Sequence, residues 1–182
     1  MNGALAIAPI LIPLAAAAVQ VLLGIRFRRF RTGLSFLSCL ALVAVAALLM
    51  MSASRGEGAT LVYSLGNWPA RFAIVLVVDR LSALMLLLTA VLALAVLPYA
   101  LGRWQRMGPH FQPLVQVLLV GYNGAFLTGD LFNLFVFFEV LLAASYGLAL
   151  HGSGARRVGA SLHYIAINLT ASMLFLVGVG LI

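Results

Sequence analysis

The sequence contains very little charge and no lysine. Of its 182 residues, four are acidic and eleven are basic, and every basic residue is arginine. Charged residues make up 8% of the chain and hydrophobic residues 64%, with a mean hydropathy of +1.16. A soluble domain is about 25% charged and about 45–50% apolar, so this composition excludes a water-soluble fold.

The sequence lacks the residues needed for metal binding, phosphate binding and Ser/His/Asp catalysis. The single cysteine, Cys39, lies within an apolar run, with no Cys, His or acidic residue at metal-ligand spacing, so we expect it to pack against helices or lipid and expect no metal site. The sequence has neither a glycine-rich phosphate loop nor a Ser/His/Asp arrangement. We therefore expect a protein that is not an enzyme and holds no cofactor.

The arginines lie in short gaps between long apolar runs, and they line no face of an amphipathic helix. This distribution is typical of residues that set membrane topology, so it does not indicate nucleic-acid binding despite the net charge of +7. We therefore expect membrane lipids, and no nucleic acid, as partners of the chain.

The apolar runs predict a polytopic all-α membrane fold with six spans. A bilayer core of about 30 Å needs about 20 apolar residues in a helix. Runs of that kind cover residues 4–24, 32–51, 81–100, 111–128, 131–150 and 159–182. No basic region precedes the first run, so we expect it to remain as a membrane helix. The last run is still apolar at Ile182, and we expect one membrane domain, 1–182, that belongs to a longer protein.

Arginine counts in alternate connections predict the orientation, because short loops rich in arginine stay cytoplasmic. The first, third and fifth connections hold Arg26, Arg28, Arg29, Arg31, Arg103, Arg106, Arg156 and Arg157, and the opposite side holds Arg55, Arg71 and Arg80. We therefore expect the N-terminus to be exoplasmic, in the inner membrane of a bacterium.

The connection between the second and third spans has a strand-like pattern. Apolar segments at residues 60–64 and 72–77 flank the turn sequence Gly66-Asn67-Trp68-Pro69. We expect a small exoplasmic β-hairpin here. Asp79 then stands where the third span needs an N-cap.

One carboxylate falls near the middle of a span. In the run LFNLFVFFEVLL, Glu139 lies about 12 Å from the helix start, and an ionised side chain at the bilayer centre costs roughly 2.5–3.5 kcal/mol. On its own helical face only Tyr146 offers a hydrogen bond, so its partner has to come from another helix, water or an ion. A mobile cationic neighbour would make Glu139 load and release protons. The alternative is a static strut that holds helices together.

Other polar residues are less informative. Asp130 precedes the fifth span and is expected to cap it. His163, in the sixth span, could relay protons or could bond a neighbouring helix, and we assign it to the ion pathway. Asn168 is expected to be structural.

Two long segments, VVDRLSALM at 77–85 and NGAFLTGDLFNLFVFFEV at 123–140, closely resemble the D-type subunit of the multisubunit cation/proton antiporters called Mrp, Mnh or Pha. Residues 63–70, 144–148 and 162–164 resemble the same subunit. Shorter parts of the motif recur in antiporter-like subunits of respiratory complex I and of membrane-bound hydrogenases.

The resemblance implies a longer inverted-repeat fold, and other subunits as partners in a hetero-oligomeric complex that exchanges Na⁺ or K⁺ for H⁺. It also implies that Glu139 pairs with a lysine on a seventh helix, a residue that this chain lacks. Two alternatives stay open: a proton-pumping subunit of a redox-driven complex, and a membrane scaffold that does not transport.

Overall fold

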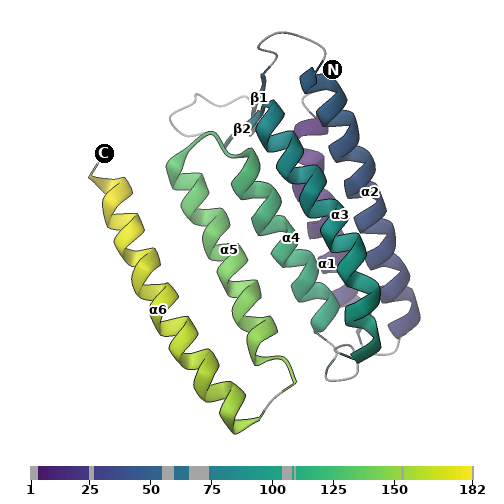
Figure 1. Cartoon of the computed structure of the whole chain (residues 1–182), viewed down its shortest axis with the longest axis vertical. Helices are drawn as coiled ribbons and strands as arrows, with labels where there is room; N and C mark the ends of the chain where they lie inside the picture. Colours follow the sequence, from purple (N-terminus) through teal and green to yellow (C-terminus); the bar gives the residue numbers. More distant parts are fainter. Residues whose placement is uncertain are drawn as a thin grey trace.

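The computed structural model describes residues 4–24, 27–54, 60–65, 74–103, 108, 110–152 and 154–181. It contains six long helices and one two-stranded sheet, which confirms the predicted all-α membrane fold with a small hairpin between the second and third helices (Figure 1). The elements in chain order are α1 (Ala4–Leu22), α2 (Arg28–Ser54), β1 (Leu61–Ser64), β2 (Val75–Val78), α3 (Arg80–Arg103), α4 (Phe111–Leu127), α5 (Leu131–Leu150) and α6 (Ala155–Gly180).

Among the described residues, five helices are long and apolar enough to cross a membrane. The exception is α4, with 17 residues, which at 1.5 Å per residue is about 26 Å long and still close to the thickness of the hydrocarbon core. Consecutive helices are antiparallel, so their connections alternate between the two ends of the bundle (Figure 1). The chain is a multi-pass membrane protein.

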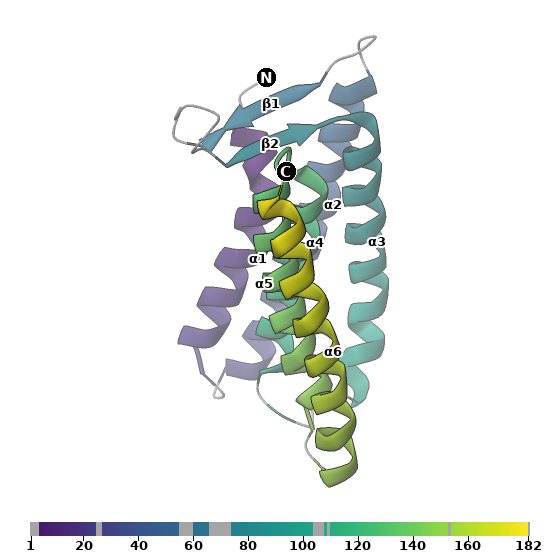
Figure 2. The same cartoon turned by 90° about the vertical axis from the view of Figure 1, so that its left-hand side faces the viewer.

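The hairpin covers one end of the bundle (Figure 2). Its strands are antiparallel, with Leu61 opposite Val78 and Ser64 opposite Val75. On β2, Leu76 and Val78 are buried and pack into a core cluster that also includes residues of α1, α2, α3 and α4. The predicted second strand began earlier, at residue 72, but residues 72 and 73 and the predicted turn lie outside the described residues.

The hairpin is also joined to the turn between α4 and α5. The backbone N–H of Gly129 donates to the carbonyl of Val75 at 2.9 Å, and Leu76 forms a bridge with Thr128. A Cβ on Gly129 would lie 2.6 Å from Cγ2 of Val77, so the turn approaches the strand as closely as only glycine permits. The start of α5 is thereby fixed to the sheet.

A reciprocal cap begins α3. The Asp79 carboxylate accepts a hydrogen bond from the backbone N–H of Ser82 at 2.6 Å, and the Ser82 hydroxyl accepts one from the backbone N–H of Asp79 at 2.8 Å. The N–H and hydroxyl groups of Ser82 lower the pKa of Asp79, because both stabilise the ionised carboxylate.

A proline pair determines how α1 meets α4. Pro13 has no N–H, so the carbonyl of Pro9, four residues earlier, has no donor within α1. The side-chain amide of Asn123 on α4 donates to that carbonyl at 2.7 Å, and the bond is buried. A helix irregularity in the sequence is thus satisfied by a residue more than a hundred positions away.

Candidate functional site in helices α5 and α6

Helix α5 places Glu139 near its middle, and Asp130 fixes where the helix begins. The Asp130 carboxylate accepts hydrogen bonds from the backbone N–H of Phe132 and from the side-chain amide of Asn133, both at 3.0 Å. Asp130 is therefore the N-cap of α5, in the position for which the sequence suggested it.

Close packing against α4 determines which way Glu139 points. A Cβ on Gly121 would lie 2.6 Å from Cβ and 2.8 Å from Cα of Leu141, and a Cβ on Gly124 would overlap the ring of Phe137. Residues 137 and 141 of α5 therefore face α4. Glu139 lies two positions from each, about 200° around the helix, so it faces away from α4.

The neighbour on that side is α6. Ser172 is 9% exposed, and its hydroxyl donates a hydrogen bond to Oε1 of Glu139. Glu139 itself is half-buried within the described chain. The carboxylate thus meets a neutral hydroxyl, a partner that offers a hydrogen bond but no compensating charge.

A cavity of about 310 Å³ lies beside this contact, between α5 and α6. Phe175 lies in its wall and packs on Phe135 and Phe138, with ring centroids 6.4 and 6.1 Å apart. The lining consists of Phe135, Phe138, Leu141, Leu142, Asn168, Ala171, Ser172 and Phe175. Two of these residues are polar, and both belong to α6.

His163 lies elsewhere on α6. It is nine positions before Ser172, which is about 13 Å along the helix and about 180° around it. Its side chain is exposed within the described chain, and its Nδ1 lies 3.0 Å from the carbonyl of Gly159 in the same helix. The structure therefore does not bring His163 together with Glu139.

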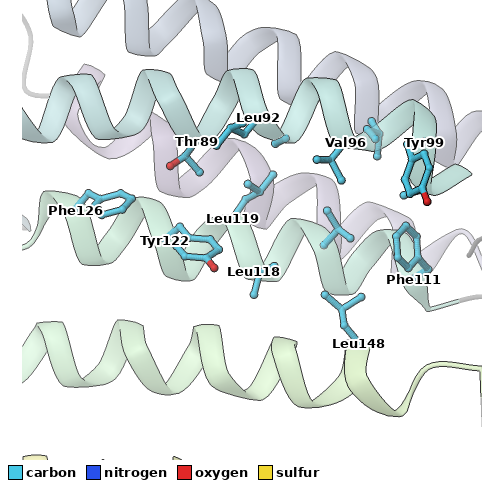
Figure 3. A pocket seen from close by; sticks show the side chains of 14 residues that line it. Thr89, Leu92, Val96, Tyr99, Phe111, Leu118, Leu119, Tyr122, Phe126 and Leu148 are labelled. Atoms are coloured by element: carbon cyan, nitrogen blue, oxygen red, sulfur yellow. The ribbon is translucent and has the colours of Figure 1, made fainter. Parts of the chain in front are cut away.

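A larger cavity, of about 650 Å³, lies between α3 and α4 (Figure 3). Its walls are aliphatic and aromatic, and the polar side chains among them are Thr89, Tyr99 and Tyr122. None of these side chains carries charge at neutral pH, so the described lining offers an ion hydroxyl oxygens but no compensating charge. In the part of the chain that the structure describes, no group of three or more His, Cys, Asp or Glu side chains could hold a metal.

Sequence reasoning missed Ser172, the residue that contacts the acid. A signal was present: Ser161, Tyr164, Asn168 and Ser172 recur at intervals of three or four residues, which places them on one face of a helix. The histidine of α6 is the more conspicuous residue in the sequence, and it lies off this face.

The fold and the acid together define a class: multi-pass membrane proteins with a carboxylate inside a transmembrane helix. Comparison with known proteins narrows the class. The chain is 59% identical over 181 residues to the D-type subunit of a probable K⁺/H⁺ antiporter of Rhizobium meliloti (strain 1021), and this match covers 98% of the chain and 34% of that protein. It is 40% identical over 184 residues to the D-type subunit of the Na⁺/H⁺ antiporter of Alkalihalophilus pseudofirmus, covering 100% of the chain and 36% of that protein.

The structural comparison agrees. The chain superposes on a chain of the Mrp complex from Dietzia sp. DQ12-45-1b with a TM-score of 0.87 and 34% sequence identity, covering 98% of this chain and 34% of that one. No established family profile matches. The chain belongs to the family of D-type subunits of multisubunit cation/proton antiporters, as the resemblance of its motifs predicted. It spans about a third of the length of the relatives it matches.

Proposed function

We propose that this chain is part of an ion-translocating subunit that exchanges a monovalent cation, Na⁺ or K⁺, for protons, with Glu139 as a proton-carrying group. The observation that carries the proposal is the position of Glu139: an acid in the middle of a membrane helix, directed toward α6 and contacted there by the neutral hydroxyl of Ser172. Acids in such positions generally mark proton or ion pathways.

The membrane makes the ionised form of Glu139 costly. An ionised carboxylate at the bilayer centre costs roughly 2.5–3.5 kcal/mol, and one hydrogen bond to a charged group returns about 1.5–3 kcal/mol but supplies no counter-charge. A neutral, protonated Glu139 avoids most of this cost. The acid is therefore expected to change its protonation when a cation approaches or leaves, and the lysine implied by the family resemblance is the expected cation.

Membership of a larger assembly follows from the relatives, whose names describe subunits and a complex. We propose other antiporter subunits as the partners of this chain and a bacterial inner membrane as its location. Six of the arginines lie at the start of α2, at the end of α3 and at the start of α6, and these helix ends lie opposite the hairpin (Figure 1). We therefore place the hairpin and the N-terminus on the exoplasmic side.

His163 has a more limited proposed role. Because it faces away from Glu139, any proton it carries would be exchanged with groups other than Glu139. Replacing His163 by Gln tests this role: a loss of antiport as severe as that of a Glu139 variant would place both residues on one pathway.

The decisive experiment is Glu139→Gln in the assembled antiporter, assayed by cation-induced proton movement in inverted membrane vesicles. Glutamine keeps the size and hydrogen-bonding capacity of the side chain but cannot release a proton, so antiport should be abolished while assembly is unchanged. Asp130→Asn is the matched control, because it neutralises an acid on the same helix whose role is to cap. If Glu139→Gln lowered assembly and activity in proportion, the scaffold interpretation would replace ours.

A further inference from the structure

We infer that the interface between α5 and α6 is a hydrated seam that carries protons between Glu139 and the end of the bundle where the α5–α6 connection lies. The inference rests on the proposed function of Glu139 and specifies the route by which the proton arrives. It starts from an inverted burial pattern. Among the described residues of α6, the buried ones are two serines, Ser161 and Ser172, at 5% and 9% exposure.

The apolar residues of α6 face outward instead. Ile167, Met173 and Leu174 are 70%, 55% and 68% exposed within the described chain. In a membrane, an apolar outer face needs no explanation, but a polar inner face does, because each buried polar group requires a partner. Only part of that requirement is met by bonds between the two helices.

The polar groups follow one face of α6 along the interface, with intervals between them. From Glu139 and Ser172 the line continues to Asn168, one helical turn away, whose side-chain N–H donates to the carbonyl of Tyr164 at 2.9 Å. The Tyr164 hydroxyl lies 2.9 Å from Oγ of Ser145 on α5. Ser161 lies a further turn toward the start of α6, so the line covers about 16 Å at 1.5 Å per residue.

Tyr146 completes the α5 side of the line. It lies two turns from Glu139 on the same helical face, and its ring meets that of Tyr164 edge-on, with centroids 5.6 Å apart. Glu139, Tyr146 and Ser145 on one helix thus oppose Ser172, Asn168 and Tyr164 on the other.

The cavity of about 310 Å³ supplies space for water beside the acid. A water molecule occupies about 30 Å³ in the liquid and needs two to four polar partners, so this volume is ample and the polar partners limit the occupancy. Asn168 and Ser172 are the polar residues that line this cavity. In the proposed step, such a water accepts the proton that leaves Glu139, and the Ser172 hydroxyl donates to the carboxylate that remains.

The alternative is that the same polar groups only hold two membrane helices together, as serine, asparagine and tyrosine often do. Water access separates the two interpretations. Hydrogen-bonded helices without water would shield Asn168 and Ile167 equally from a charged reagent, whereas a hydrated seam would expose Asn168 alone.

Cysteine labelling of the assembled antiporter tests the inference, because the chain has a single native cysteine, Cys39, which is fully buried and can be replaced by serine. In a background with no reactive native cysteine, Asn168→Cys and Ile167→Cys place a thiol at nearly the same membrane depth on two different faces of α6. The probe is a membrane-impermeant, cationic methanethiosulfonate applied from the side of the α5–α6 connection. Thiols react as thiolates, which form in water and not in hydrocarbon.

We expect Asn168→Cys to react about tenfold faster than Ile167→Cys or more, because thiolate formation needs water. Ser161→Cys, nearer the connection, should react at least as fast as Asn168→Cys. Equal rates at the two deeper positions, or no reaction at Asn168→Cys and Ser161→Cys, would overturn the inference.

The two proposals fail in different ways. If Glu139→Gln abolishes antiport but Asn168→Cys stays unreactive, the function stands and the route is wrong. If Asn168→Cys reacts while Glu139→Gln antiports normally, the seam holds water but does not serve Glu139, which overturns both the route and the role of the acid.

Discussion

Polar side chains inside the first four helices and inside α5 and α6 serve different purposes. In the first region, neutral groups bond across helices: Gln20 to Ser35, Ser38 to Gln116, Gln112 to Thr32, and Asn123 to the carbonyl of Pro9. The surrounding residues are mainly buried Leu, Ala and Val. In the second region an ionisable acid meets a hydroxyl, and the buried residues of α6 are serines.

The two regions differ in whether the polar group between their helices can change its charge. A neutral amide bonded to a carbonyl or hydroxyl gains nothing by changing protonation, so such bonds hold helices in one arrangement. A carboxylate in an apolar surrounding has two forms, and the preferred one depends on what approaches it. The first region is therefore expected to respond to mutation through stability, and the second through transport.

The largest effect is expected where the two regions touch. Gly121→Leu would place a side chain where even a Cβ lies within 2.8 Å of the backbone of Leu141, so α4 and α5 would have to separate. We expect a loss of about 3 kcal/mol or more, since overpacking a tight contact costs about 1–3 kcal/mol and this contact includes backbone. Thermal unfolding in detergent measures the loss.

Gly33→Leu is the control for this prediction. A Cβ at Gly33 on α2 would meet no atom within 4 Å, so the same change of residue should cost little there. Similar losses at both positions would mean that Gly121 is not a special contact.

A smaller loss is expected inside the first region. Asn123→Leu leaves the buried carbonyl of Pro9 without a donor, which should cost about 1–3 kcal/mol. Pro13→Ala restores the missing N–H of α1 and should make Asn123 dispensable. A double-mutant cycle measures this: the cost of Asn123→Leu should shrink in the Pro13→Ala background. Additive costs would show that the amide serves another purpose.

The sequence predicted much of the fold but less of the site. Apolar runs located all six helices, and a turn between two apolar segments located the hairpin. The bond between Asn123 and Pro9 could not be foreseen, because it depends on α1 packing against α4 across the chain. The direction of Glu139 follows from which face of α5 the glycines of α4 occupy, and a single helix pattern does not contain that information.

The cap of α3 should respond to pH. Because the folded chain lowers the pKa of Asp79, its contribution to stability is present above the unfolded value of about 3.9 and is lost as the pH falls through the lower folded value. Asp79→Asn still caps the helix but does not titrate, so it should reduce the loss of stability at low pH. Asp79→Ala should instead cost about 1 kcal/mol at neutral pH. Unfolding temperatures measured from about pH 6 down to about pH 3, a range that brackets the unfolded value, separate the two effects.

The smallest change in stability should accompany Ser172→Ala, although its bond is the one that touches the acid. Hydrogen bonds between membrane helices contribute about 0.6 kcal/mol on average, so unfolding should shift very little. Antiport should nevertheless slow, because Glu139 loses the group that orients its carboxylate, and Ser172→Thr, which keeps the hydroxyl, should restore the rate. Such a result would separate the two regions most clearly, since Asn123→Leu would lower the stability of the protein and Ser172→Ala would mainly lower the rate of antiport. Normal transport in Ser172→Ala would instead place this bond among the static ones.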